Sequence, residues 1–424
     1  MMPVLRPLRA FYRRRFEAFR PDVRRVLRVD IRAALLLTAF TGLTAPFTGL
    51  ILRRELGATP FQLSIMSSAS AVFMLLSLFW ARSVRDRTPL PYVVWPGVIG
   101  RGLFLLVPLI HSSWAFIAVL VAVSLLGTVG APASTALVER VYPHDQRGRA
   151  LAMVRVTAAV PGIALALVAG TILAVADYRW VFAAAGLLGI AGSLRQREIP
   201  VPERPPMASA ERSGLREAWR TLRRDRDFRR LLFAHFVFGS AIWLEMPANP
   251  LVLADVVRAT TTQVGVFAAA GAVAALVANA GWGRFADRRS NLRALRLVYC
   301  LGVITALLYA VADSAWIMVL VAVSDAAMTT GLDLVWMLAL IEVAGARRTA
   351  HYAAISATLA GVRGIVGPLV GAVVVEHVGI QAVYVVAASL MISAAWLVSR
   401  EVHDAETQPV ARFTRRLLNA IPGR

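Results

Sequence analysis

The chain has 424 residues, of which 58% are hydrophobic and 17% are charged, whereas a soluble protein carries about 25% charged residues. The formal net charge is +21, and all 46 basic residues are arginines. Most of these arginines lie in tails, one linker and short loops beside long apolar runs, which excludes a basic nucleic-acid-binding domain. The alternating strands of a β-barrel are missing from the sequence, so the composition predicts an all-α polytopic membrane protein.

The N-terminal residues 1–32 contain ten arginines and no long apolar run. This segment is too long and too charged for a cleaved signal peptide, so we interpret it as a basic cytoplasmic tail. Leu, Phe and Val recur among the arginines at roughly helical spacing. The tail is therefore either an amphipathic helix on the anionic inner leaflet or a simple solvated segment.

Twelve apolar segments follow, at about residues 33–52, 60–81, 91–110, 114–138, 150–175, 179–194, 231–254, 262–282, 295–311, 314–341, 350–375 and 379–399. A helix of ~20 residues crosses a ~30 Å hydrocarbon core. One substantial polar linker separates the first six segments from the last six. The expected organisation is a tail (1–32), a six-helix bundle (33–194), a cytoplasmic linker (195–230), a second six-helix bundle (231–400) and a basic C-terminal tail (401–424).

The distribution of the arginines indicates the orientation of the chain. With the N-terminus inside, 39 arginines lie on the cytoplasmic side and four lie outside. This bias follows the positive-inside rule. We therefore expect a multi-pass protein of the inner (cytoplasmic) membrane, with both termini and the linker in the cytoplasm.

The two halves are related by a nearly constant offset of 201 residues. The offset pairs Pro46 with Pro247, Gln62 with Gln263, Asp86 with Asp287, Arg147 with Arg348 and Gly170 with Gly371. Six spans per half is an even number, so both copies have the same orientation in the membrane. The sequence thus predicts 12 transmembrane helices in two parallel six-helix repeats.

The loop after the eighth span reads GRFADRRSNLR over residues 283–293, and the loop after the second span contains the related RSVRDRTP. Gly283, Asp287 and Arg288 match the G-x-x-x-D-R motif of the major facilitator superfamily, which the chain resembles from about residue 33 to 400. In the first copy, Arg82 stands where the family has Gly. The resemblance implies two bundles around a central cavity that opens alternately to each side, lined mainly by the first, fourth, seventh and tenth spans.

Ionisable groups within a span each cost at least ~2.5 kcal/mol, so each marks a candidate site. Glu245 lies in the seventh span, and Asn249 lies one turn further along the same helix face. Pro247 and Pro250 interrupt the backbone hydrogen bonds there. A broken helix beside a carboxylate suits a binding site or gate. The alternative is a kinked helix whose Glu bonds to a neighbouring backbone.

The tenth span carries Asp325 and Asp333 on one face, roughly 12 Å apart by helix rise. A carboxyl group removed from water exchanges its proton at ordinary pH, which makes Glu245 and Asp325 the candidate proton carriers. The alternative for Asp325 is a structural salt bridge with Arg363 of the eleventh span. Arg363 either forms this bridge or binds an anionic substrate, a role for which Arg155 is the second candidate.

The charged loops predict a cytoplasmic gate. We expect Asp86 and Asp287 each to meet the positive N-terminal end of a helix in the opposite half, and Arg87 to pair with Glu139 at the end of the fourth span. The alternative is that the arginines are only topological signals. The predicted gate residues are Asp86, Arg87, Glu139, Gly283, Asp287 and Arg288.

The sequence contains no phosphate-binding loop and no metal-ligand cluster, so neither an enzyme nor a cofactor is expected. We predict a monomeric secondary transporter in the lipid bilayer, with a small solute and protons as partners and no nucleic acid. Proton-coupled efflux of an amphipathic compound is the first choice, and uptake of a small organic anion is the alternative. A non-transporting membrane sensor or scaffold is the alternative of another class.

Overall fold

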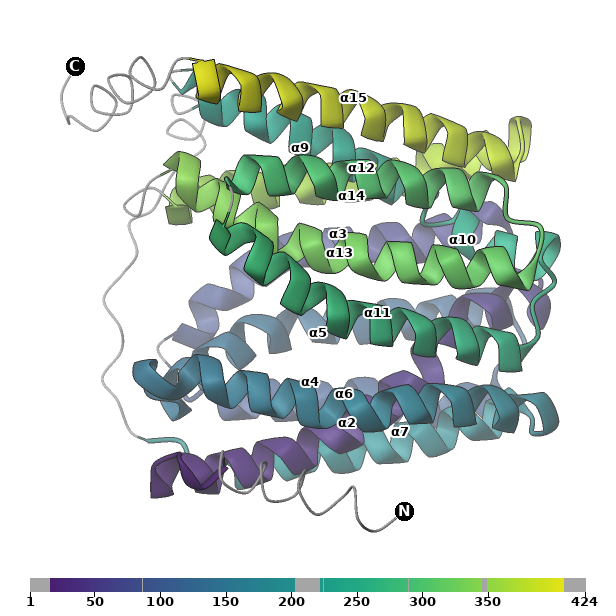
Figure 1. Ribbon diagram of the computed structural model, residues 1–424. Coiled ribbons are helices and arrows are strands. Elements are labelled where there is room, and N and C mark those ends of the chain that lie inside the picture. Colours follow the sequence, from purple (N-terminus) through teal and green to yellow (C-terminus); the bar gives the residue numbers. More distant parts are fainter. Residues whose placement is uncertain are drawn as a thin grey trace, which may run out of the picture. The chain divides into compact units, whose positions relative to one another are not determined.

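The computed structural model describes residues 16–85, 87–202, 222–223, 225–288, 290–344 and 349–407. All regular elements in these ranges are helices (Figure 1). They form twelve long helices when helices that continue into one another are counted once. Ten of the twelve are long and apolar enough to cross a membrane, and the other two are α3 and α7. The predicted all-α membrane architecture is confirmed.

The first six long helices precede the linker and the last six follow it. The first set comprises α2 (Pro21–Arg54), α3 (Pro60–Arg85), α4 (Leu90–Gly102) with the 3-10 helix η1 (Leu103–Leu109), α5 (Ser113–Val141), α6 (His144–Val175) and α7 (Tyr178–Arg195), followed by the short η2 (Gln196–Glu198). The second set comprises α9 (Arg226–Glu245) with α10 (Ala248–Leu251) and the π-helix η3 (Val252–Val256), α11 (Thr261–Arg288), α12 (Asn291–Ala310), α13 (Ala315–Ala344), α14 (Thr349–His377) and α15 (Ile380–Thr407). Residues 203–221 of the linker lie outside the described residues.

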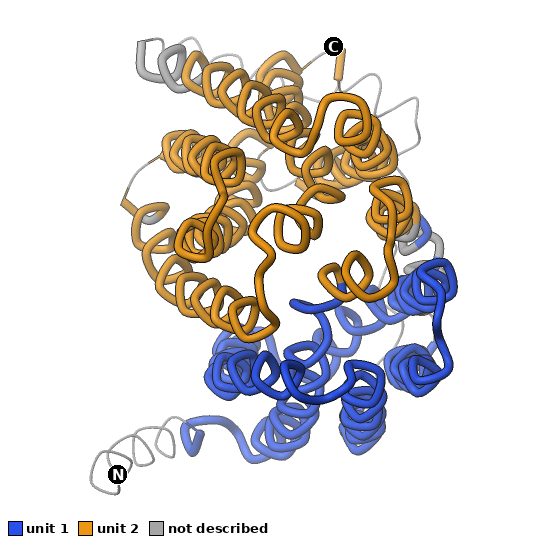
Figure 2. The backbone as a smooth tube through the Cα atoms, turned by 90° about the vertical axis from the view of Figure 1, so that its right-hand side faces the viewer, with its two compact units in different colours: residues 1–48, 76–208 blue, residues 49–75, 209–424 orange. Residues whose placement is uncertain are grey.

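The chain folds into two compact units, which Figure 2 shows in different colours. Unit 1 contains residues 1–48 and 76–208, and unit 2 contains residues 49–75 and 209–424. Both boundaries in the first half fall inside helices, one in α2 and one in α3. The hairpin of residues 49–75 therefore packs with the C-terminal repeat, although the sequence places it in the N-terminal one.

In unit 1, α2 begins at Pro21, ahead of the start expected at Ala33. Its first turns are helical because their apolar side chains, such as Leu27, are buried in a cluster with the ends of α5 and α6. Tyr142, which follows α5, donates a hydrogen bond of 2.7 Å to Asp30 of α2. Burial and the Asp30 carboxyl group raise the pKa of Tyr142, so the phenol keeps the proton that it donates.

Unit 2 contains a similar contact at the start of its first long helix. Asp225 caps α9 by accepting a hydrogen bond from the backbone of Phe228. The hydroxyl of Tyr352 on α14 donates to the same carboxylate over 2.6 Å. The rings of Phe228 and Tyr352 pack at 3.8 Å between centroids. Each repeat thus ties the beginning of its first helix to its fourth or fifth helix through a tyrosine and an aspartate.

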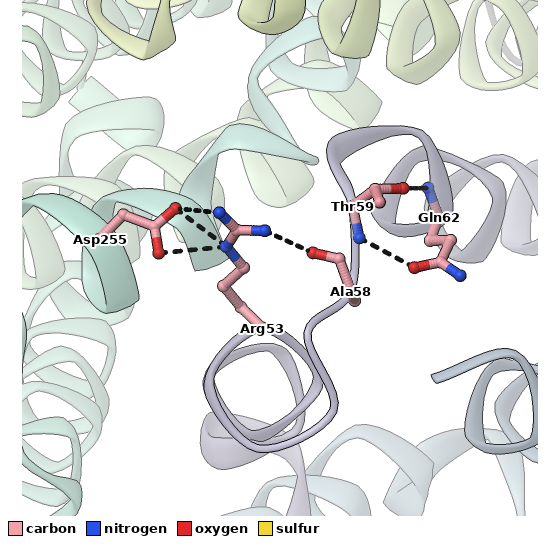
Figure 3. A network of polar contacts seen from close by, with 5 residues as sticks. All are labelled: Arg53, Ala58, Thr59, Gln62 and Asp255. Atoms are coloured by element: carbon pink, nitrogen blue, oxygen red, sulfur yellow. Dashed lines mark hydrogen bonds and ion pairs between the residues drawn. The ribbon is translucent and has the colours of Figure 1, made fainter. Parts of the chain in front are cut away.

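The turn between the first two helices of each repeat is duplicated in its hydrogen bonds. Thr59 and Gln62 cap α3 reciprocally, with bonds of 2.8 and 3.2 Å between the backbone N–H of each and the side chain of the other (Figure 3). Thr260 and Gln263 form the same capping box on α11, with bonds of 2.9 and 3.2 Å. The offset of 201 residues predicted from the sequence is therefore preserved in local hydrogen bonding.

The backbone just before each capping box is also duplicated. Gly57 has φ +62°, and Arg258, 201 residues later, has φ +53°. A left-handed conformation suits glycine but is uncommon for arginine. Arg258 keeps this conformation because the second turn has the same geometry as the first. The Ala259 N–H donates to the Leu253 carbonyl, just as the Ala58 N–H donates to the Leu52 carbonyl.

Candidate functional site

The seventh long helix of the chain is broken in the middle. Its first part, α9, ends at Glu245, and the chain resumes as α10 and the π-helix η3. Pro247 and Pro250 lack the N–H groups that a continuous helix needs, so they account for the interruption. π-helical turns frequently occur at functional sites. The break predicted from these prolines is thus present, with Glu245 as the last residue before it.

Glu245 is the buried acidic group of this break. Only 3% of the residue is exposed, and its Oε2 atom has no hydrogen-bond partner among the described residues. The group interacts electrostatically with Asp325 of α13. An acidic side chain at the C-terminal end of a helix also faces the negative end of the helix dipole. This site therefore combines two acidic groups with the negative end of α9.

Asn249, one turn beyond Glu245, is held by aromatic side chains. Its Oδ1 accepts a hydrogen bond of 2.8 Å from the hydroxyl of Tyr384 on α15. Tyr384 stacks on Tyr309 of α12, with ring centroids 4.8 Å apart and an angle of 6° between the rings. Both tyrosines lie within electrostatic range of Glu245. Five helices of unit 2 thus contribute polar groups to one cluster of buried and partly buried residues, which we call the Glu245 cluster: Glu245, Asn249, Tyr309, Asp325 and Tyr384.

The polar face of α13 changes from partly buried to exposed along its length. Asp325 is half-buried, whereas Asp333 is exposed. Thr329 lies between them, exposed, and donates a hydrogen bond to the backbone carbonyl of Asp325. The structure therefore brings Asp325 to Glu245 and leaves Asp333 outside the Glu245 cluster.

Arg363 does not form the salt bridge with Asp325 that the sequence suggested as an alternative. Within the described part of the chain, Arg363 contacts no carboxylate; its Nη1 donates instead to the backbone carbonyl of His235. Its Nη2 lies 3.3 Å from Nε2 of His235. The side chain is 8% exposed. The guanidinium bonds to α9 because a glycine, Gly239, leaves room for it there, and a Cβ at Gly239 would overlap it.

His235 was not singled out in the sequence, yet it organises this second buried network. A guanidinium only donates hydrogen bonds, so Nε2 of His235 must accept and Nδ1 must carry the proton. Nδ1 lies 3.1 Å from the hydroxyl of Tyr299 on α12. Trp336 of α13 stacks on the imidazole at 3.5 Å and 8°. Single His, Tyr and Trp residues in apolar spans have no characteristic spacing, so the sequence carried no signal for this network.

The remaining predicted cavity residue, Arg155, belongs to unit 1. It lies on α6 and its side chain is exposed. The Glu245 cluster, in contrast, belongs entirely to unit 2.

The predicted pair of Arg87 and Glu139 is not formed. Arg87 donates a hydrogen bond of 2.7 Å to the hydroxyl of Tyr92 on α4, because the two residues are only five positions apart in the chain. Glu139 is half-buried, and its backbone carbonyl accepts a bond of 3.1 Å from Arg147. This pairing in the predicted gate was wrong for the conformation seen here.

The other predicted gate residues are only partly described. Arg288 is exposed at the end of α11, and a Cβ at Gly283 would meet no atom within 4 Å. Asp86 lies outside the described residues, and so does the side chain of Asp287. The contact of these two aspartates with helix ends remains a prediction.

The sequence and the fold of this chain are similar to those of known proteins. The Major Facilitator Superfamily profile matches residues 33–245 and 231–420. A solved structure of a mutant form of the nucleoside transporter NupG is similar with a TM-score of 0.70 and 11% identity, covering 88% of this chain and 99% of that one. A bacterial homologue of the human lysosomal transporter Spinster, solved in an inward-facing, unoccupied conformation, is similar with a TM-score of 0.60 and 13% identity, covering 90% and 96%. No curated protein sequence matches significantly.

Proposed function

Because this chain belongs to the Major Facilitator Superfamily, whose members are membrane transporters and not enzymes, we propose that it moves a small solute by alternating access and couples this movement to protons. The Glu245 cluster is the proposed coupling site. The observation that supports it best is the carboxyl group of Glu245, which is 3% exposed, has an unpartnered oxygen and interacts electrostatically with a second carboxyl group, that of Asp325.

The chemistry of the cluster favours proton exchange at Glu245 and Asp325. An ionised carboxylate needs hydrogen-bond donors or a counter-ion when it is removed from water. Among the described residues, the Oε2 atom of Glu245 has no hydrogen-bond partner, and Arg363 of α14 bonds to His235 instead. A single proton bound by either carboxyl group relieves the repulsion between them. The broken helix next to Glu245 then gives the site a backbone that can adjust to this change.

Efflux of an amphipathic compound is the proposed direction and substrate class. The composition supports it, because the predicted cavity-lining spans are mainly apolar and carry few charges. The arginine distribution supports an inner-membrane location with both termini in the cytoplasm. Gate roles for Gly283, Asp287 and Arg288 remain part of the same proposal.

Uptake of a small organic anion is the second candidate. Arg363 is engaged by His235 and nearly buried, which argues against it as the recognition group. Arg155 is exposed and remains the cation for this alternative. A sensor or scaffold that binds partners without transport is the alternative of another class.

A vesicle assay tests the proposal. Candidate solutes, including amphipathic amines, organic anions and nucleosides, are first ranked by thermal stabilisation of the purified protein. The best ligand is then offered to proteoliposomes with an imposed pH gradient. We expect Glu245→Gln and Asp325→Asn each to abolish gradient-driven movement, while Glu376→Gln, a change of an exposed acid on α14, leaves it intact. Unchanged gradient-driven movement in both cluster variants would refute the assignment of Glu245 and Asp325 as proton carriers. If the parent protein moved none of the stabilising ligands, the result would favour a sensor or scaffold that does not transport.

A further inference from the structure

The first turns of α2 in unit 1 carry a row of exposed arginines. Arg25, Arg28 and Arg32 are all exposed, and their spacing of three and four residues places them on one face of the helix. The opposite face buries Val26 and Leu27 in a cluster with the ends of α5 and α6. This packing fixes the helix, so the arginine face points away from the bundle.

The length of α2 places these arginines at the membrane surface. Its 34 residues extend for about 51 Å, whereas the hydrocarbon core is about 30 Å thick. The apolar span expected at residues 33–52 puts Arg32 at the edge of this core and Arg28 about 6 Å further out. The headgroup layer on each side is about 5–7 Å deep. Arg28 and Arg32 therefore lie at the depth of lipid headgroups, with Arg25 just beyond them.

A fourth arginine is held near the same surface by a tryptophan. Trp95 is the sixth residue of the candidate span Leu90–Leu109 and is 50% exposed. Tryptophan favours the membrane–water interface, so this ring faces lipid. The guanidinium carbon of Arg197 in η2 lies 5.6 Å from the ring centroid. Ile199, two residues later, is buried in the same cluster as Val93 of α4 and the first turns of α2. The tryptophan, its arginine and the arginine face of α2 thus surround one cluster.

These four arginines lack acidic partners within the described chain. None of them forms an ion pair there, and the one hydrogen bond that they make joins Nε of Arg28 to the Arg24 carbonyl at 3.4 Å. The acidic side chains nearest to them in the chain are already engaged: Asp22 with Arg20, Asp30 with Tyr142 and Glu198 with Arg195. Among the described residues, four positive charges are therefore left without a carboxylate at the membrane surface.

We propose that the arginine face of α2, together with Arg197 and Trp95, binds the headgroups of anionic phospholipids. We call these five residues the headgroup site: Arg25, Arg28, Arg32, Trp95 and Arg197. A guanidinium presents a planar fork of N–H donors that matches two oxygens of a phosphate group. The helix that carries the fork is already ordered, so binding requires little further ordering of the backbone. The headgroup site does not depend on which solute the protein moves.

The position of the tryptophan favours a lipid over a soluble acidic partner. Trp95 lies within a span, and Arg32 lies at the edge of one, where the bilayer covers the protein surface. A soluble partner can approach Arg25 from the water but has no access to the ring of Trp95. Only a molecule that is itself part of the bilayer contacts the ring and the arginines together.

A titration of the purified full-length protein in neutral detergent tests the headgroup site. Short-chain phosphatidylglycerol is added, and the midpoint of thermal unfolding is followed, because a ligand that binds only the folded state raises this midpoint. Short-chain phosphatidylcholine has the same phosphate with a neutral headgroup overall. Inorganic phosphate and polyglutamate represent soluble anions. We expect phosphatidylglycerol to raise the midpoint with saturation and the other three additives to have little effect.

Variants identify the residues that bind the lipid. Arg28→Gln, Arg32→Gln and Arg197→Gln should each weaken the apparent affinity for phosphatidylglycerol roughly fivefold. Arg20→Gln and Arg195→Gln are the matched controls, because each removes one charge from an exposed arginine that already pairs with an acid. The controls should bind nearly as the parent does. All of these side chains are exposed, so the midpoints without lipid should equal that of the parent.

Three results would overturn the headgroup site. Equal stabilisation by phosphatidylcholine would show that the negative headgroup is not recognised. Equal stabilisation by inorganic phosphate or polyglutamate would identify a surface for soluble anions instead. Equal losses of affinity in the site variants and the controls would mean that only the net charge of the protein matters. None of these measurements involves transport, so they leave the proposed function to its own test.

Discussion

Gly49 and Pro250 meet in space although they are 201 residues apart, and 201 is the offset of the internal repeat. Each residue thus contacts its own equivalent in the other copy. Glycine is required at this point because a Cβ would come within 3.0 Å of the proline ring.

Substitution of Gly49 tests this close approach. We expect Gly49→Ala to destabilise the protein by about 1–3 kcal/mol, the usual cost of overpacking a tight contact. Gly42→Ala, about two turns earlier in α2, is the control, since its Cβ would meet Leu165 at an ordinary 3.6 Å. Thermal unfolding in detergent should show a lower midpoint for the first variant and an equal or higher one for the second. Equal midpoints for both would contradict the contact.

The position of Arg363 leads to a second prediction. Gly239→Ala should displace the guanidinium from the His235 carbonyl and cost about 1–3 kcal/mol. In combination with Arg363→Met, which removes the displaced group, the added cost of Gly239→Ala should be smaller than in the parent. A double-mutant cycle on thermal stability measures this coupling. Strictly additive effects would mean that the two side chains do not share this space.

The third prediction compares matched variants of the two stacked tyrosines, Tyr309 and Tyr384. Tyr384→Phe removes the hydroxyl that bonds Asn249 and should cost about 1 kcal/mol while weakening gradient-driven transport. Tyr309→Phe keeps the stacked ring and removes a hydroxyl that makes no hydrogen bond to the described residues, so its effect on stability should be smaller. Transport in proteoliposomes and thermal unfolding are compared for both. A larger loss in Tyr309→Phe would place the functional hydroxyl on α12 instead.

Much of the architecture could be predicted from the sequence because it depends on local and periodic features. Long apolar runs require helices in a bilayer, where each backbone N–H and C=O must be bonded within its own segment. The repeat was detectable because Gln62 and Gln263 cap their helices in the same way, which preserves residue type at a fixed offset. Pro247 and Pro250 predicted the broken helix because a missing N–H acts locally.

Partners of charged side chains could not be predicted in the same way. A salt bridge with Asp325 was one of two alternatives for Arg363, because opposite charges in neighbouring spans attract. The guanidinium instead bonds to His235, since Gly239 leaves a space on α9 that the sequence pattern does not reveal. Arg87 bonds to Tyr92 of the next helix, and the pairing expected with Glu139 required a long-range contact that local bonding replaced.

The sequence by itself determined the helices, their duplication and the membrane class, because these follow from apolar length, proline chemistry and the recurrence of residues at one offset. Only the tertiary structure decided which charges meet. It placed the hairpin of residues 49–75 with the opposite repeat and brought Arg53 to Asp255, whose two carboxylate oxygens lie 3.1 and 2.9 Å from Nε of the arginine (Figure 3). The physical reason is that a forked ion pair needs two backbones within a few ångströms of each other, and this proximity is produced by packing between residues far apart in the chain.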